Sequence, residues 1–374
     1  MKGLAITNIG IEDISASEIK ELTSAKTSKG KGRVVFETGK FEDFFRLCYR
    51  SQSFLKVMLL LARFRIKNVD DINAQIQKLN LDEWLKGSTF VVRSGTRNSS
   101  LAKAEIESET GAFIIGKTKA KVDLHEPDTT FFVFVDGDEC FLGVDFSGDD
   151  LGKREYRIFT GRESMKPTVA YSLLRISGFK DNGSLLDPFC RAGTITIEAA
   201  LFASKTPVNY FSKDKFLFLK LKKFRDYDFD RFFEEEDKKI RQKIKAKITA
   251  ADQSFQAVSS AKKNAKIAGV EKTINFSRKQ PEWLDTKFRE HEIGMIVSFP
   301  PQKGKSLPEK AAAKIYNELF YQADYILKKE GIVTLLLKET SAAEAEAKKY
   351  GFNIKSKRKI MQGKEEFNIA VFGK

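Results

Sequence analysis

The sequence predicts an α/β protein in which two smaller α+β parts precede a parallel sheet covered by helices on both faces. Three observations predict this fold class. Short strand and helix patterns alternate over the first 150 residues, a polar, Gly-containing stretch follows at residues 147–167, and from Lys166 onward strands alternate regularly with helices. Regular alternation is typical of a parallel sheet, because each parallel connection needs a crossover that is usually a helix.

The first segment, residues 1–67, has the pattern of a small α+β unit of ferredoxin-like type. Its strand and helix signals follow one another in the order β-α-β-α-β. We expect strands at residues 3–9, 32–38 and 54–66 and helices at residues 11–23 and 40–51.

The second segment, residues 68–150, opens with a helix whose acidic residues lie in its first turn, as the helix dipole favours. Its last two strands are joined by a tight turn and predict a hairpin. We expect helices at residues 68–79 and 100–118 and strands at residues 88–98, 129–136 and 139–147. A linker is placed at residues 151–165, because the surrounding stretch is polar and contains Gly.

The third segment, residues 166–374, carries the parallel-sheet pattern. We expect strands at residues 184–189, 246–252, 272–278, 293–301 and 331–339, helices from Thr194 and at residues 255–269 and 310–328, and a final pair of strands. An insert at residues 204–247 carries 14 Lys/Arg against 8 Asp/Glu and many aromatic residues. It predicts either a nucleic-acid face or an amphipathic helix whose Phe side chains face the core and whose lysines face water.

The formal net charge of +15 favours a polyanionic partner, because clustered Lys and Arg gain affinity by releasing counterions from phosphates. The charge is uneven along the chain. Residues 1–67 carry 13 Lys/Arg against 7 Asp/Glu, residues 68–150 carry 8 against 16, and the remainder carries 45 against 28. A lysine-rich solvated surface is the alternative interpretation of the same excess.

Composition excludes several other classes of protein. The three cysteines lie far apart and only two histidines occur, which argues against a zinc site and predicts no metal. The apolar run at residues 57–62 is too short to span a bilayer, and the N-terminus lacks a signal-peptide pattern. We therefore expect a cytoplasmic protein, in which most of the 32 phenylalanines pack in the core.

Candidate ligand-binding residues follow the strands of the third segment, since open parallel sheets bind ligands beyond the carboxyl ends of their strands. In the stretch "DPFCRAGT", Asp187 provides a carboxylate at a strand end, and Gly193 and Thr194 allow a cofactor to approach the backbone. Arg191 is the exception, because its bulk and charge intrude on the space that a glycine leaves open.

Two further strand ends carry candidates. Asp252 closes "ITAAD", where a carboxylate accepts ribose hydroxyls or, alternatively, caps the helix that begins near Phe255. The stretch "FPPQ" at residues 299–302 places two prolines where a substrate would lie, and a plain turn is its alternative interpretation.

These residues resemble a known family. "LLDPFCRAGTITIEAALFA" resembles the first motif of class I S-adenosylmethionine-dependent methyltransferases, in particular "DPFCGSGTIxIEAA" of the THUMP-domain RNA methyltransferases. "GIEDISASEI", "VVRSGTRNSSLAKAEIESETGAFI" and "SMKPTVAYSLLRISG" resemble the family's N-terminal segment, THUMP domain and start of the catalytic domain. The resemblance spans almost the whole chain and is nearest to the tRNA guanine-N2 methyltransferases.

The resemblance implies a Rossmann-like C-terminal domain that binds S-adenosylmethionine and a THUMP domain that grips tRNA, so that a guanine amine is methylated after the base leaves its stack. The cofactor-binding positions that it implies are Asp187, Phe189, Gly193, Thr194, Asp252 and Gln280. The catalytic motif that it implies lies at Pro300, Pro301 and Gln302, with Phe299 in front of it.

The sequence departs from the family pattern at three strand ends, which read as independent changes. Arg191 and Ala192 replace Gly-Ser, Lys279 or Gln280 stands where the family has an Asp that holds the adenine amine, and Phe299 replaces Asn or Asp. In the family that Asn or Asp and the Pro carbonyl accept hydrogen bonds from the target amine, and Phe299 has no acceptor. Gln302, which replaces an aromatic, offers an amide oxygen from a shifted position.

Two hypotheses follow for function. The first is a tRNA-binding protein that methylates guanine N2 with S-adenosylmethionine, and the second is a catalytically inactive protein that binds tRNA or another structured RNA on the same scaffold. The candidate RNA contacts cluster near the predicted strand-turn-helix junction of the second segment and just after its helix. They are Arg93, Arg97, Lys103, Lys117, Lys119 and Lys121.

Overall fold

The computed structural model describes residues 1–161, 165–304 and 307–374. The chain divides into two compact units, each made of segments that are not contiguous in sequence. The first unit contains residues 1–7, 16–151 and 211–236, and the second contains residues 8–15, 152–210 and 237–374. Among the described residues, no helix has the length and apolar character needed to cross a membrane.

The first unit is built on one eight-stranded sheet with the order β2-β3-β1-β4-β8-β7-β5-β6. Its strands are β1 (Lys2–Thr7), β2 (Lys26–Gly30), β3 (Arg33–Glu37), β4 (Phe54–Arg65), β5 (Thr89–Arg97), β6 (Lys121–Val122), β7 (Thr129–Asp136) and β8 (Glu139–Asp145). Antiparallel pairing of β4 with β8 joins the two predicted N-terminal segments into this sheet. The predicted strands and hairpin are confirmed, whereas β2 and the two-residue β6 were not expected from the sequence.

Helices cover one face of this sheet. They are α1 (Glu12–Thr23), α2 (Phe41–Arg50), α3 (Val69–Lys78), the short α4 (Asp82–Leu85) and α5 (Lys103–Thr118). The start of α3 has a reciprocal cap, in which the side chains of Asn68 and Asp71 each accept a hydrogen bond from the backbone of the other residue. The apolar core on this face contains aromatic residues of α2 such as Phe44, Phe45 and Tyr49.

The predicted insert at residues 204–247 is divided between the two units. Its middle part, residues 211–236, belongs to the first unit, contains α8 (Phe229–Asp237) up to its last residue, and carries 7 Lys/Arg against 7 Asp/Glu. Phe211 of this part is exposed, whereas five phenylalanine side chains are buried in the core of the first unit: Phe216, Phe218, Phe224, Phe232 and Phe233. Their burial confirms the core-packing interpretation for these five phenylalanines.

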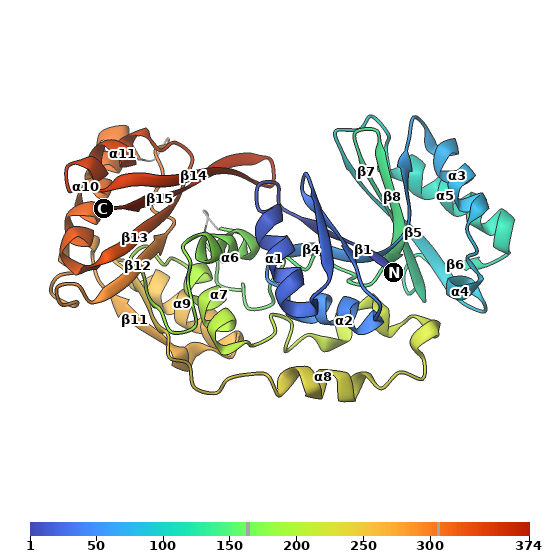
Figure 1. The fold of residues 1–374 in the computed structure, drawn as a ribbon, viewed down its shortest axis with the longest axis horizontal. Helices are drawn as coiled ribbons and strands as arrows, with labels where there is room; N and C mark the ends of the chain where they lie inside the picture. The colour runs from blue at the N-terminus through green and yellow to red at the C-terminus, as the bar shows by residue number, and fades with distance from the viewer. Residues whose placement is uncertain (162–164, 305–306) are drawn as a thin grey trace. The chain divides into compact units, whose positions relative to one another are not determined.

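The second unit is a seven-stranded sheet with the order β11-β10-β9-β12-β13-β15-β14. Its strands are β9 (Ser184–Asp187), β10 (Lys247–Asp252), β11 (Ile274–Arg278), β12 (Ile293–Ser298), β13 (Leu327–Leu337), β14 (Asn353–Gln362) and β15 (Glu365–Gly373). The first five are parallel, and β15 and β14 close the sheet as an antiparallel pair (Figure 1). The predicted parallel sheet and its final strand pair are confirmed.

Two helical layers enclose this sheet, as the sequence predicts. One layer consists of α6 (Pro167–Ile176), α7 (Thr194–Ser204) and α9 (Phe255–Ile267), and the other of α10 (Glu309–Ile326) and α11 (Ser341–Lys348). Side chains that alternate along each strand divide between the two layers, so that Leu185 packs on the first and Leu186 on the second.

The stretch predicted as a linker packs on the second unit where it is described. Arg154 and Tyr156 both contact Glu198 of α7, and the charged atoms of Arg154 and Glu198 form a pair with no exposed side-chain surface. Residues 162–164 of that predicted linker lie outside the described residues.

Candidate active site

The candidate site lies where the strand order of the second unit reverses. The chain proceeds from β9 outward to β10 and β11 and then returns to place β12 on the other side of β9. Ligands bind at such a switch point, because the connections leave opposite faces and open a crevice at the carboxyl ends of the strands. Asp187 ends β9 and Ser298 ends β12, and the Ser298 hydroxyl donates a hydrogen bond of 2.5 Å to Oδ1 of Asp187.

Asp187 is buried and held by neighbours of its own loop. Its Oδ1 also accepts a hydrogen bond from the backbone N–H of Phe189, at 3.2 Å. Burial raises the pKa of Asp187 to about 7, against the opposing effect of the Ser298 hydrogen bond. Ser298 had no motif in the sequence to mark it as a partner of this acid.

The loop from β9 to α7 has the backbone shape of a cofactor loop. Gly193 has a φ of 80° at the N-cap of α7, and a Cβ there would lie 2.9 Å from the Cβ of Ala261. Asn264 of α9 is fully buried and donates a hydrogen bond to the carbonyl of Ala192 at 3.0 Å. Thr194 begins α7 directly after this turn. The loop is thus fixed from behind by α9, and Asn264 is a contributor that no sequence signal marked.

Asp252 lies beside this loop at the end of β10. One carboxylate oxygen accepts the backbone N–H of Arg191 at 3.0 Å and the other accepts that of Ser254 at 2.9 Å. The alternative interpretation of Asp252 as a helix cap is wrong, because the side chain of Ser254 accepts the N–H of Ala257 and caps α9. Asp252 is mostly buried, with 8% of its surface exposed.

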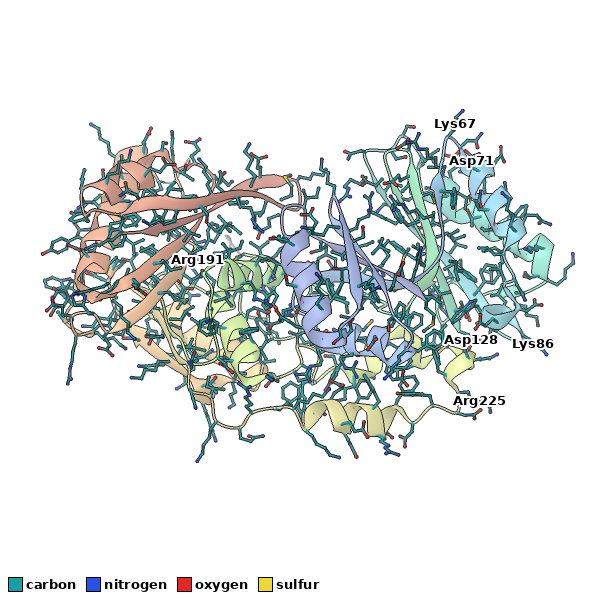
Figure 2. The ribbon with its side chains drawn as sticks, viewed as in Figure 1. Lys67, Asp71, Lys86, Asp128, Arg191 and Arg225 are labelled. Carbon is teal, nitrogen blue, oxygen red and sulfur yellow. The ribbon has the colours of Figure 1, made fainter. Side chains whose placement is uncertain are left out.

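Arg191 lies over Phe299 in the space between the two strand ends. Its backbone has a φ of 49°, and its guanidinium carbon lies 4.5 Å from the centre of the Phe299 ring. The ring of Phe299 in turn packs edge-on against Phe367, with centroids 5.9 Å apart. Figure 2 labels Arg191 among the elements of the second unit. Two of the three departures from the family pattern, Arg191 and Phe299, therefore lie in contact with each other.

A small cavity adjoins this loop. A cavity of about 30 Å³ is lined by Asp187, Phe189, Arg191, Thr194 and Phe299, together with neighbouring residues. That volume holds about one or two water molecules, whereas sites for small molecules usually have roughly 300–1,000 Å³. A cofactor bound against this loop would compete with the side chain of Arg191 for the space beside the Phe299 ring.

The stretch at residues 299–302 places its polar groups against the backbone. The side-chain amide of Gln302 donates to the carbonyl of Pro300 at 2.7 Å, and its oxygen accepts the N–H of Lys338 at 3.0 Å. The hydroxyl of Tyr316 lies 3.4 Å from the carbonyl of Pro301. Gln302 therefore binds the proline carbonyl that the family pattern offers to the target amine.

The third strand end carries no acid within the expected loop. Gln280 is exposed and lies at the start of a short helical turn (Pro281–Trp283), after β11. The backbone N–H of Lys279 donates to the carbonyl of Asp252 at 3.0 Å, and its ammonium group donates to Thr286 at 2.8 Å. The structure thus brings Asp187, Asp252 and the "FPPQ" stretch together and leaves Gln280 at the rim.

The candidate RNA contacts of the first unit do not form one patch. Arg93 and Arg97 lie on β5, where Arg97 pairs with Asp136 and Arg93 donates to the carbonyl of Leu124. The ammonium group of Lys117 donates to three backbone carbonyls at the end of α3. Lys103 begins α5, while Lys119 follows its end and Lys121 lies on β6. An α-helix of 16 residues is about 24 Å long, so these lysines lie well apart.

The comparisons with known proteins agree with this fold. The family described as "RMKL-like, methyltransferase domain" matches residues 154–366, and the THUMP domain family matches residues 67–145. The chain is 30% identical, over 97% of its length and 95% of the relative's, to a tRNA (guanine(6)-N2)-methyltransferase of Methanocaldococcus jannaschii.

Two solved structures share the fold of the whole chain. A possible methylase from Clostridium difficile 630 has a TM-score of 0.86 at 22% identity and covers 100% of this chain and 97% of its own. A putative methyltransferase crystallised with SAH has a TM-score of 0.84 at 21% identity, with coverage of 100% and 97%. From the matched families, the near full-length relative and the architecture, the chain belongs to the THUMP-domain class I methyltransferase family, with an RMKL-like methyltransferase domain.

Proposed function

We propose that this chain binds tRNA and that its activity is that of the tRNA guanine-N2 methyltransferases. The observation that carries the proposal is the 30% identity to the archaeal tRNA (guanine(6)-N2)-methyltransferase, which extends over 97% of this chain. An identity that spans the THUMP domain and the methyltransferase domain together supports a shared substrate class more strongly than a likeness of either domain alone. S-adenosylmethionine is the methyl donor in this proposal.

The division of labour follows the matched regions. We propose an N-terminal ferredoxin-like segment at residues 1–67, a THUMP domain at 68–150, a linker at 151–165 and the methyltransferase domain at 166–374. The matches at residues 67–145 and 154–366 support the THUMP domain and the methyltransferase domain, and the second match begins within the proposed linker. Two short segments depart from this linear division: residues 8–15 belong to the second compact unit, and residues 211–236 belong to the first. In the THUMP part, exposed Lys103, Lys119 and Lys121 stay the candidate phosphate contacts, together with Arg93.

The cofactor residues in the proposal are Asp187, Phe189, Gly193, Thr194 and Asp252, with Gln280 at the rim. The geometry of the loop and the position of Asp252 support the ribose end of such a site. At the other end, Arg191 has to leave Phe299 before the donor can be held near the "FPPQ" stretch.

A second candidate function is favoured by one specific observation. The guanidinium group of Arg191 covers the ring that replaces the family's hydrogen-bond acceptor, and Gln302 occupies the neighbouring proline carbonyl. A site closed in this way fits a protein that binds tRNA without methylating it. Both candidates share the tRNA-binding scaffold and differ in chemistry.

Methyl transfer to bulk tRNA separates the two candidates. The purified chain is incubated with unmodified tRNA and methyl-labelled S-adenosylmethionine, and the nucleosides are then analysed for N2-methylguanosine. Label in that nucleoside, lost in the Asp252→Ala variant, supports the methyltransferase. Retained tRNA binding without any methylated nucleoside supports the second candidate and contradicts the first.

A further inference from the structure

The net positive charge of the chain comes entirely from the second unit. The segments of the first unit together carry 28 Lys/Arg and 28 Asp/Glu, so its net charge is zero. The segments of the second unit carry 38 Lys/Arg and 23 Asp/Glu, a net charge of +15. Attraction of a polyanion by this protein therefore has its source in the methyltransferase unit rather than in the THUMP unit.

Within the second unit the cations concentrate in the last part of the insert, residues 237–247. This part carries six Lys/Arg and a single acid, Asp237. All six cationic side chains are exposed, and we call them the basic strip: Lys238, Lys239, Arg241, Lys243, Lys245 and Lys247. The segment follows α8, which is labelled in Figure 1, and leads along the chain into β10.

The segment is held in place although most of it has no regular secondary structure. Ile244 packs against the core of the second unit and Ala246 is buried, so the apolar residues point inward and the lysines between them point outward. The backbone N–H of Arg241 donates to Ser204 at 2.7 Å, and that of Lys247 donates to Gly183 at 2.9 Å. The charges of the basic strip are thus presented by a fixed backbone.

Few acids neutralise the basic strip. Arg241 pairs with Asp181, whereas Lys238, Lys243, Lys245 and Lys247 form no ion pair with any residue in the described part of the chain. Glu271, which lies in the loop before the neighbouring strand β11, pairs instead with Lys262 at 3.6 Å. Unpaired ammonium groups keep their full charge for a ligand, and each one bound to a phosphate releases about one counterion.

The basic strip lies at the amino edge of the parallel sheet, opposite the candidate active site. Lys247 pairs with Ser184 at the first residues of β10 and β9, and Ile248 pairs with Ile274 at the first residue of β11. Asp252 lies at the far end of β10, which at about 3.3 Å per residue places it roughly 15–20 Å away. Two further exposed lysines, Lys180 and Lys272, lie in the loops that precede β9 and β11.

We propose that the basic strip is a second RNA-binding surface, which holds the phosphate backbone of the same RNA at the amino edge of the sheet. The inference rests on the proposed tRNA binding and adds the surface that provides its charge. The strip contains no aromatic side chain for stacking, so its contacts are to phosphates and tolerate different sequences. It contains no outward apolar residue either, which an anionic membrane surface would need for insertion.

The test compares two triple variants of the full chain that remove equal charge. One is Lys243→Gln with Lys245→Gln and Lys247→Gln in the basic strip. The matched control is Lys314→Gln with Lys348→Gln and Lys364→Gln, three exposed lysines on α10, on α11 and in the turn between β14 and β15 that form no ion pair within the described residues. Circular dichroism and thermal unfolding first verify that both variants fold as the wild type does.

Binding to bulk tRNA is then measured between 50 and 300 mM salt. We expect the strip variant to bind about tenfold or more weakly than wild type at the middle of this range, with its salt slope reduced by about 2–3. The control variant and a Lys→Arg triple at the strip positions should stay within about threefold of wild type.

The outcomes separate the two levels of the proposal. Equal loss in the strip and control variants overturns the strip and leaves tRNA binding intact. Absence of tRNA binding in the wild-type chain overturns the proposed function and the strip together. Strip-dependent binding to vesicles of phosphatidylserine and phosphatidylcholine, with no strip dependence for tRNA, assigns the surface to a membrane and overturns the RNA inference.

Discussion

The two edges of the seven-stranded sheet differ in almost every physical respect. At the carboxyl edge, Asp187 and Phe299 are buried, Arg191 lies over the Phe299 ring, and these residues line a cavity of about 30 Å³. At the amino edge, the basic strip is exposed, and Lys238, Lys243, Lys245 and Lys247 form no ion pair within the described residues. Both edges belong to the same sheet, but the carboxyl edge is filled by its own side chains, whereas the amino edge is exposed and carries an excess of positive charge.

This difference indicates that the amino edge contributes affinity for RNA, whereas the carboxyl edge is the place for the chemical step. An open row of lysines binds a polyanion through counterion release and needs no specific geometry. A closed edge needs fixed geometry, because its loop, its acid and its aromatic ring act only in one arrangement. If the comparison is right, changes at the closed edge alter stability and cofactor affinity, and changes at the open edge alter RNA affinity alone.

The largest expected effect is on the buried pair behind the closed edge. Glu198 of α7 accepts hydrogen bonds from Arg154 at 3.0 Å and Tyr156 at 2.9 Å, and no surface of the Arg154 or Glu198 side chain is exposed. Glu198→Ala removes the carboxylate from a buried guanidinium and should lower the free energy of unfolding by about 3–5 kcal/mol. Urea denaturation measures this loss. Glu198→Gln, which keeps the hydrogen-bond acceptor, should lose less, and equal stability of Glu198→Ala and wild type would contradict the prediction.

A smaller loss of stability is expected when the hydrogen bonds between Asn264 of α9 and the loop that follows β9 are removed. The Asn264 side chain donates to the carbonyls of Phe159 and Ala192 at 3.0 Å each and accepts the N–H of Phe159 at 3.1 Å. Asn264→Ala should destabilise the chain by about 2–3 kcal/mol, because buried backbone groups lose their partners. Hydrogen exchange should also quicken at Ala192 and Gly193. The exposed position Lys266 on the same helix is the control, where Ala should change stability by less than about 0.5 kcal/mol.

At Asp187 we expect a substitution to raise the stability of the chain, in contrast to the two substitutions above, and the gain should depend on pH. Its pKa in the folded chain is raised to about 7 by burial, so the folded state holds a proton that the unfolded state releases near pH 4. The stability of the wild type should therefore fall as pH rises from about 4 to 7. Asp187→Asn, which still accepts from Ser298 and Phe189, should be equal to wild type at pH 4 and more stable by on the order of 1–3 kcal/mol at pH 8. Thermal unfolding across this pH range tests the sign, and a difference that shrinks with rising pH would contradict the assignment.

The smallest change in stability is expected at Arg191 itself. Arg191→Gly loses the contact with the Phe299 ring, worth about 0.5–2 kcal/mol. The same substitution stabilises the backbone by about 1 kcal/mol, because residue 191 has a φ of 49° and glycine adopts that conformation without strain. The two terms oppose each other, so the free energy of unfolding should change by less than about 1 kcal/mol. A large destabilisation would show that Arg191 serves the fold rather than the site.

Much of the fold could be predicted from the sequence because its periodic segments are long. The strands of the parallel sheet and the helices α7, α9 and α10 were predicted within a few residues, since each carries a clear apolar pattern between turn residues. The missed elements have weak or no patterns: β2 reads KTSKG, β6 has two residues and α4 has four, while α11 is rich in Ala, Glu and Lys. The helix α6 was also missed, because it begins at the end of the polar stretch that the sequence marks as a linker.

The site could be predicted only as far as its motif residues. Asp187, Asp252 and the "FPPQ" stretch meet because parallel strands place their carboxyl ends at one edge. The contact between Arg191 and Phe299, the hydrogen bond from Ser298 and the support from Asn264 depend on tertiary positions that no local pattern encodes. The same limit applies to the insert, whose charge balance became informative only after residues 211–236 were placed in the other unit.

The most direct test is calorimetric titration of the wild-type chain, the Arg191→Gly variant and the Arg191→Lys variant with S-adenosylmethionine and with its demethylated product. The closed carboxyl edge predicts that Arg191→Gly binds the cofactor at least tenfold more tightly than the wild type, and that Arg191→Lys, which keeps a long cationic side chain, stays near the wild type. Micromolar binding by the wild type that equals binding by Arg191→Gly would show that Arg191 does not compete for the cofactor space, and would contradict the account.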